Sequence, residues 1–162
     1  MKKAVYTGSF DPITLGHLNV IERSSRLVGE LVVGIGVNSE KSGLFEPDER
    51  VDLVRRCTEH LSNVEVRCFE GLAVNFVKEC GTRVMIRGVR PLTDIAGEFT
   101  MTMANRRLNA ELETVFLMAD ADYAHVSSSL IKQITPLASD EQLAKFVPKA
   151  IVGDLRSKLE SR

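Results

Sequence analysis

Short apolar runs alternate with longer amphipathic stretches along the chain, and this alternation limits the possible folds more than any other feature. Five runs rich in Val and Ile are candidate strands, at residues 3–6, 31–37, 64–69, 83–86 and 114–118. Several are apolar almost throughout, which is typical of parallel strands covered on both faces. The pattern therefore predicts an α/β fold: a doubly wound, Rossmann-like five-stranded parallel sheet with helices on both faces.

The stretches between these runs carry helical signals. Candidate helices span residues 17–28, 47–60, 72–80, 94–108, 128–135, 140–146 and, as a C-terminal amphipathic helix, about 148–159. The first places Leu18, Ile21 and Leu27 roughly on one face. Pro47 suits a first helical position, and Gly81 suits a helix end. No linker, repeat or composition shift divides the chain, so residues 1–162 are expected to form one domain.

Charge and cysteine content exclude several classes of protein. A formal net charge of −1 argues against a nucleic-acid binder that neutralises many phosphates. Three cysteines without a CxxC pair fit reduced thiols in a cytoplasmic protein. No run approaches the roughly 20 apolar residues of a membrane span, and the start of the chain has too few for a signal peptide. A cytoplasmic protein without nucleic-acid or membrane partners is expected.

The segment TGSFDPITLGH, residues 7–17, lies between the first candidate strand and the first candidate helix. The first turn of a helix has unpaired N–H groups and the positive end of the macrodipole, so it suits a phosphate. His17 could add a proton donor there. The chain has neither a GxxxxGK[ST] loop nor a GxGxxG turn after the first strand, which argues against Walker-type and dinucleotide-binding enzymes.

Polar or small residues follow each of the five candidate strands. They are Ser9 and His17, residues 38–41, Leu72 and Ala73, residues 87–90, and residues 123–129. Ligands of such sheets bind at the carboxyl ends of the strands, near the point where strand order reverses. The sequence therefore predicts one pocket at this edge.

Simpler interpretations exist for each group. Arg87 and Arg90 could grip phosphate in a bidentate fashion or be surface charges, and Lys41 could be solvated. The serines 127–129 could cap a helix, bind phosphate, or do both. Glu98 would usually lie on a solvated helix face. No nucleophile–base–acid triad is visible, which favours chemistry that needs alignment and charge neutralisation, such as transfer between phosphates.

Three motifs together carry a family resemblance. They are Thr14-Leu15-Gly16-His17, Val126-Ser127-Ser128-Ser129 and Ile86-Arg87-Gly88-Val89-Arg90. At these spacings, from about residue 2 to 158, the chain resembles the bacterial phosphopantetheine adenylyltransferases of the nucleotidyltransferase α/β superfamily. Members transfer an adenylyl group reversibly from ATP to 4'-phosphopantetheine, giving dephospho-CoA and pyrophosphate in coenzyme A synthesis. The acceptor phosphate attacks in line, without a covalent enzyme intermediate.

The resemblance also implies residue roles. His17 would be catalytic, stabilising charge on the α-phosphate. Ser9, Lys41, Ala73 and Arg87 would bind 4'-phosphopantetheine. The ATP site would comprise Ser9, Phe10, His17, Gly88, Val89, Arg90, Glu98, Tyr123, Ala124, His125, Val126, Ser127, Ser128 and Ser129. Mg²⁺ would accompany ATP through its phosphates and water, with no protein ligand. A homohexamer, with CoA as a feedback inhibitor, is the implied form.

Two other functions stay open at this stage. A sister nucleotidyltransferase could act on nicotinate mononucleotide or glycerol phosphate, although the 86–90 string argues against it. A non-catalytic adenine-nucleotide sensor with a flavodoxin-like fold would bind ATP without releasing pyrophosphate, although the intact His17 argues against that.

Overall fold

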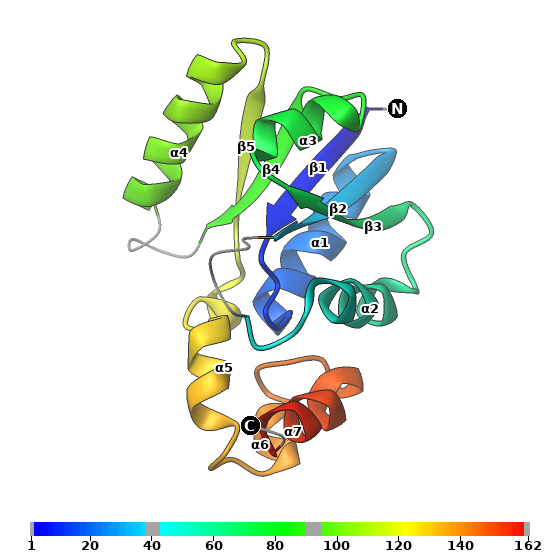
Figure 1. Ribbon diagram of the computed structural model, residues 1–162, viewed down its shortest axis with the longest axis vertical. Helices are drawn as coiled ribbons and strands as arrows, with labels where there is room; N and C mark the ends of the chain where they lie inside the picture. Colours follow the sequence, from blue (N-terminus) through cyan, green and yellow to red (C-terminus); the bar gives the residue numbers. More distant parts are fainter. Residues whose placement is uncertain (1, 38–42, 90–94, 161–162) are drawn as a thin grey trace.

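A single parallel sheet forms the centre of the molecule. The computed structural model describes residues 2–37, 43–89 and 95–160. Its strands are β1 (Lys3–Gly8), β2 (Glu30–Val37), β3 (Val64–Glu70), β4 (Val84–Val89) and β5 (Glu113–Met118), all parallel, in the order β3-β2-β1-β4-β5 (Figure 1). The order reverses between β1 and β4. The predicted five-stranded α/β sheet is confirmed.

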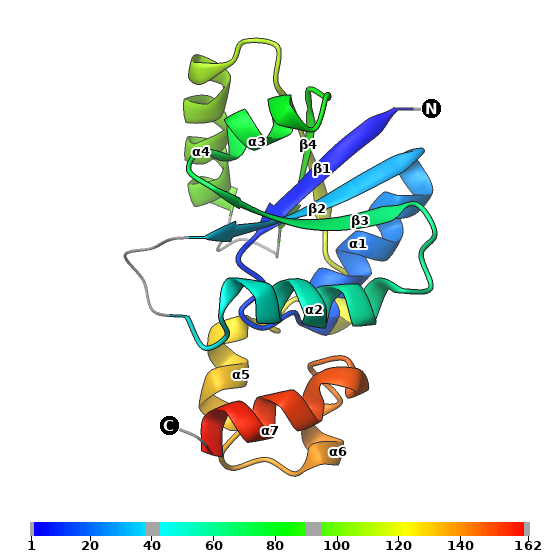
Figure 2. The same ribbon diagram turned by 45° about the vertical axis from the view of Figure 1, so that its right-hand side comes forward.

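Helices cover both faces of this sheet, as the sequence predicts (Figures 1 and 2). Helices α1 (Leu15–Leu27) and α2 (Pro47–Thr58) cover one face, and α3 (Ala73–Glu79) and α4 (Ile95–Leu108) lie on the other. Beyond the carboxyl ends of the strands follow η1 (Ala121–Tyr123), α5 (Ser128–Ile134), α6 (Asp140–Leu143), η2 (Lys149–Ile151) and α7 (Val152–Glu160). Within the described ranges, no helix has the length and apolarity that crossing a bilayer requires.

The apolar interior extends from the sheet into the C-terminal helices. Alternate residues of β1 enter different clusters: Tyr6 packs on the α1 and α2 side, and Val5 packs on the α3 side. The larger cluster also includes Ile131, Leu143 and Leu155, so the C-terminal helices share a core with the sheet. The α7 region begins with a 3₁₀ turn, and the predicted C-terminal helix at 148–159 is therefore two elements, η2 and α7.

The buried face of α1 differs from the expected one. Val20 and Ile21 are buried together with Ser24 and Ser25, but Leu27 is 66% exposed. The serines can enter the interior because their hydroxyls donate to helix carbonyls, such as Ser24 to the Val20 oxygen at 2.6 Å. Leu27 ends the helix and faces water.

Strand β4 is longer than expected. The sequence placed Arg87, Gly88 and Val89 in a loop, but all three lie in β4, paired with β5 through Val89–Met118. A Cβ on Gly88 would come within 3.1 Å of the Tyr6 hydroxyl and of a Val20 methyl. A side chain here would push against Tyr6 and Val20, so glycine suits the close approach of β4 to β1 and α1 at this point.

The three cysteines are free thiols in different surroundings. Cys57 and Cys80 are buried, and Cys68 is exposed on β3. Burial raises the pKa of Cys57 to about 11 and also raises that of Cys80.

Candidate active site at the carboxyl ends of the strands

A cavity of about 520 Å³ opens at the carboxyl ends of β1 and β4, where the strand order reverses. It is lined by Tyr6, Thr7, Ser9, Thr14, Gly16, His17, Val20, Arg87, Gly88, Gly97, Glu98, Ala119, Tyr123, Val126, Ser127, Ser128 and Ser129. The N-terminal histidine, the β4 arginine and the serine cluster therefore share one space. This is the arrangement that the sequence predicts, and the volume lies in the range of small-molecule sites.

His17 is held at the start of α1 by its own capping residue. Thr14 is the N-cap, and its hydroxyl accepts from the His17 N–H at 3.2 Å. In return, the Thr14 N–H donates to Nδ1 of the imidazole at 3.1 Å. A backbone N–H can only donate, so Nδ1 is an acceptor and the proton of the neutral ring lies on Nε2. The side chain is thereby set as a hydrogen-bond donor through Nε2.

The loop before α1 fixes the imidazole from its other side. Phe10 has a positive φ of 47° and a fully buried ring, which lies 5.0 Å from the His17 ring and 5.5 Å from the Tyr6 ring between centroids. Its neighbour Ser9 is exposed and lines the cavity. A left-handed backbone at a bulky residue persists only where packing determines it, and here two rings do so.

Arg87 and Glu98 form a bidentate ion pair across the cavity wall. Nε of Arg87 donates to one carboxylate oxygen at 2.8 Å, and a terminal nitrogen donates to the other at 2.5 Å. The same guanidinium donates to the carbonyl and hydroxyl oxygens of Thr7, at 2.7 and 3.1 Å. Burial opposes the charge, but Glu98 outweighs it and raises the pKa of Arg87. The arginine thus joins β4, β1 and α4 and stays charged.

The three serines differ in what their hydroxyls do. Ser127 is the N-cap of α5 and accepts from the Leu130 N–H at 3.1 Å, so the capping interpretation holds for this residue. Ser128 donates to the Pro12 carbonyl at 2.9 Å. Ser129 lines the cavity and is exposed. The cluster is therefore both a helix start and part of the cavity wall.

The structure separates the remaining expected site residues. Phe10 is fully buried and does not line the cavity. Val89, Ala124 and His125 are close in sequence to lining residues but do not line the cavity themselves. Ala73 begins α3, after β3 at the edge of the sheet. Lys41 and Arg90 lie outside the described residues.

Sequence reasoning missed several lining residues. These are Tyr6, Thr7, Thr14, Gly16, Val20, Gly97 and Ala119. Thr14 and Gly16 belong to the T-x-G-H string, which could have revealed them, whereas Tyr6 and Thr7 could be found only from the end point of β1.

Carboxylates, imidazoles and thiols do not gather into a metal centre in the part of the chain that the structure describes. The cavity carboxylate, Glu98, is already bonded to Arg87. The donor set of the cavity consists instead of hydroxyls, N–H groups and one guanidinium, all of which suit an anion.

The chain belongs to a known class of proteins, the cytidylyltransferase-like family. A model of the family described as cytidylyltransferase-like matches residues 5–134. Among solved structures, a putative nicotinate-nucleotide adenylyltransferase from Vibrio parahaemolyticus has a TM-score of 0.71 at 17% identity, covering 96% of this chain and 99% of its own. The Plasmodium falciparum nicotinic acid mononucleotide adenylyltransferase complexed with NaAD has a TM-score of 0.63 at 15% identity, covering 97% and 95%. These two likenesses concern the fold.

Sequence relatives narrow the class further. The phosphopantetheine adenylyltransferase of Rhodopirellula baltica is 64% identical over 157 residues, which is 96% of this chain and 88% of that protein. The enzyme of the same name from Clostridium botulinum strain 657 is 45% identical over 162 residues, covering 100% and 98%. The chain belongs to the phosphopantetheine adenylyltransferase family, within the cytidylyltransferase-like proteins.

Proposed function

We propose that the cavity at the β1–β4 reversal is where this enzyme transfers an adenylyl group from ATP to 4'-phosphopantetheine, forming dephospho-CoA and pyrophosphate. One observation carries the proposal: His17, Arg87 and the 127–129 serines line the same cavity. Two anionic reactants need aligned donors there and no protein nucleophile. The acceptor phosphate attacks the α-phosphorus in line, and pyrophosphate leaves on the opposite side.

His17 is the catalytic residue in this proposal. Its Nε2–H donates to an oxygen of the α-phosphate, on which negative charge grows as the acceptor oxygen approaches. The Thr14 N–H donates to Nδ1, which leaves Nε2 as the donor that faces the substrate. A donor fixed before the reaction needs no reorganisation during it, which is the basis of electrostatic transition-state stabilisation.

In this proposal, each remaining site residue is assigned to one of the two substrates. Arg87, with Ser9, Lys41 and Ala73, is assigned to 4'-phosphopantetheine, and Glu98 is assigned to ATP with the other residues of the nucleotide site. The Arg87–Glu98 pair lies at the boundary between the two groups. An acceptor phosphate at Arg87 would compete with, or share, that pair, so binding of the two substrates should be coupled.

Mg²⁺ would bind as a complex with ATP. The hydroxyl, N–H and guanidinium donors of the cavity suit phosphate oxygens rather than a cation, so phosphates and water would hold Mg²⁺. When bound, the ion would neutralise charge on the departing pyrophosphate.

We also propose a homohexamer, a cytoplasmic location and feedback inhibition by CoA. Support for self-association comes from α4 and β5, whose exposed apolar side chains include Phe99, Met101, Met103, Phe116 and Met118. Large exposed apolar surfaces mark interaction sites. CoA contains the pantetheine phosphate and adenylyl parts of the product, so the same cavity would receive it.

One assay tests the function. The enzyme is incubated with ATP, MgCl₂ and 4'-phosphopantetheine, and both dephospho-CoA and pyrophosphate are measured. Nicotinate mononucleotide and glycerol phosphate are tested as acceptors in parallel. Pyrophosphate release with either of these alone would favour a sister nucleotidyltransferase, and ATP binding without release would favour the sensor.

A further inference from the structure

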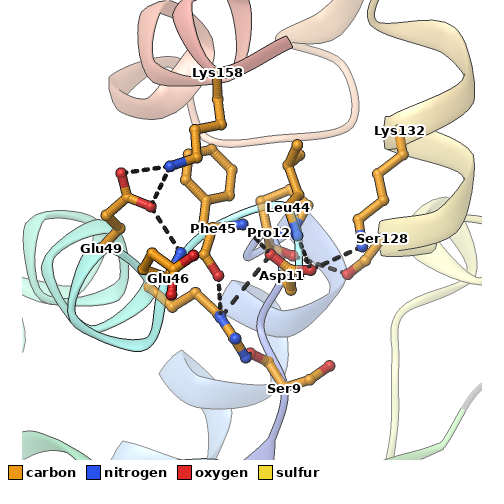
Figure 3. Close-up of polar contacts among 11 residues, drawn as sticks. Ser9, Asp11, Pro12, Leu44, Phe45, Glu46, Glu49, Ser128, Lys132 and Lys158 are labelled. Carbon is orange, nitrogen blue, oxygen red and sulfur yellow. Dashed lines mark hydrogen bonds and ion pairs between the residues drawn. The ribbon is translucent and has the colours of Figure 1, made fainter. Parts of the chain in front are cut away.

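Asp11, two residues after the loop residue Ser9, lies where three segments far apart in the sequence meet (Figure 3). One carboxylate oxygen accepts from the Phe45 N–H at 2.8 Å. The other accepts from the Leu44 N–H and from the ammonium of Lys132, both at 2.8 Å. The Asp11 side chain is 9% exposed. A single buried carboxylate thus joins the β1–α1 loop, the start of the α2 region and helix α5.

Arg50 of α2 reinforces the same junction. Its Nε lies 4.0 Å from the Asp11 carboxylate and donates to the Phe45 carbonyl at 2.8 Å, and a terminal nitrogen donates to the Ser9 carbonyl at 3.4 Å. The chain also passes close over the carboxylate at Gly43, where a Cβ would lie 3.1 Å from it. The arginine therefore connects the backbone of a cavity residue to the Asp11 junction.

Helix α5 reaches this junction through two residues one turn apart. Lys132 makes the ion pair, and Ser128, four residues earlier, donates to the Pro12 carbonyl at 2.9 Å. Ser128 also lines the cavity. The separation between Ser9 on one wall and the serine cluster on the other is therefore set by contacts centred on residues 11 and 12.

We propose that Asp11, paired with Lys132, is a positioning residue for adenylyl transfer, which fixes the loop carrying Ser9 against the helix carrying the serine cluster. The proposal rests on the function assigned above to the cavity. Asp11 is not among the lining residues, so it acts through the groups that it holds. A displacement of about 1 Å in an aligned reaction can cost about a hundredfold in rate. The Lys132 side chain is 39% exposed, and an ion pair with such an exposed partner adds little net stability, so an orienting role accounts better for this one.

The test compares two replacements of lysine by methionine. K132M removes the ammonium that faces Asp11 but keeps an unbranched side chain on α5. K158M makes the same change on α7, where Lys158 bonds to both Glu49 oxygens at 2.6 and 2.8 Å, and serves as the matched control (Figure 3). D11N and the D11N/K132M double variant complete the set. For each variant, kcat, both KM values and Tm are measured, with kinetics well below the lowest Tm.

The proposal expects a loss of turnover that the control does not show. K132M should lower kcat about tenfold and D11N about a hundredfold, with KM for ATP within about threefold of the parent enzyme. The double variant should be within about twofold of D11N, since both act through one contact. Equal kcat in K132M, K158M and the parent enzyme, with only Tm changed, would overturn the proposal even if D11N does not fold. A parent enzyme that forms no dephospho-CoA would instead contradict the proposed function.

Discussion

Helices α1 and α4 both border the cavity, yet the molecule holds them in different ways. Helix α1 buries Val20 and Ile21 against the sheet and is capped by Thr14, so its own sequence fixes His17. Helix α4 buries only Asn105 among its residues, and the ion pair between Glu98 and Arg87 ties its first turn to β4. The proposed catalytic donor thus lies on a helix packed against the sheet, whereas the proposed nucleotide contact lies on a helix whose outer face is exposed and apolar.

This difference follows from how each helix meets the sheet. On the α1 side the interior is continuous through α2 and into the C-terminal helices. On the other side the cluster is small and centres on α3, with Phe69 and Phe76 stacked at 4.4 Å. A second copy packed on α4 would supply the burial that a single chain leaves incomplete. Residues on α1 are thus positioned by the fold of one chain, whereas residues on α4 would also depend on the proposed assembly.

The largest expected effect concerns the well-packed side. H17A should lower kcat by about 10²- to 10³-fold, because one fixed donor to the transition state is lost, while ATP binding stays measurable by calorimetry. H60A is the matched control, since His60 pairs with Glu22 on the surface. An unchanged kcat for H17A would exclude the catalytic role.

The second prediction addresses the loosely packed side. F99D places a charge on the exposed apolar face of α4, where Phe99 is 60% exposed, and should weaken self-association by roughly a hundredfold because an interface cannot bury an unpaired charge cheaply. Sedimentation velocity measures the change. L137D is the control, because Leu137 is 89% exposed on the C-terminal side. If F99D and L137D assemble equally well, α4 is not the contact surface.

The third prediction concerns Arg87, whose ion pair with Glu98 connects β4 to α4. R87A should raise the KM for 4'-phosphopantetheine by about ten- to a hundredfold, since a lost charged hydrogen bond costs roughly 1.5–3 kcal/mol. R83A, at an exposed position just before β4, should leave it unchanged. Initial rates at saturating ATP provide the measurement, and equal KM values for the two variants would contradict the assignment of Arg87.

The smallest expected effect is a pH dependence of stability at Asp11. Burial raises the pKa of this carboxyl, but Lys132 and the Phe45 and Leu44 N–H groups outweigh it, so the pKa is lowered. The unfolded chain then binds the proton more readily, and the carboxylate stabilises the fold above its unfolded pKa of about 3.9. D11N should cost roughly 1 kcal/mol at pH 7, and the difference should shrink as pH falls below about 4. Urea unfolding at several pH values checks it, and a constant difference would refute the linkage.

The alternation of apolar runs predicts the sheet and the helices on both faces, and the polar residues that follow each run predict the shared cavity of His17, Arg87 and the serines. The sequence pattern does not predict how the strands pair. The apolar run ends at Ile86, and only the register with β5 shows that Arg87 and Gly88 continue the strand. Likewise, Asp11 and Lys132 are 121 residues apart, and no spacing in the sequence indicates that they touch. Local patterns encode elements, whereas the side-chain contacts between them depend on the assembled chain.

The burial of Cys57 has a consequence for an enzyme whose substrate carries a thiol. 4'-Phosphopantetheine ends in a thiol, and disulfide exchange with a protein requires a thiolate. With a pKa of about 11, Cys57 is ionised in only roughly one molecule in ten thousand at pH 7. Cys57 is thus a poor nucleophile toward the disulfide form of the substrate, and exchange with that form would fall on Cys68, which solvent reaches.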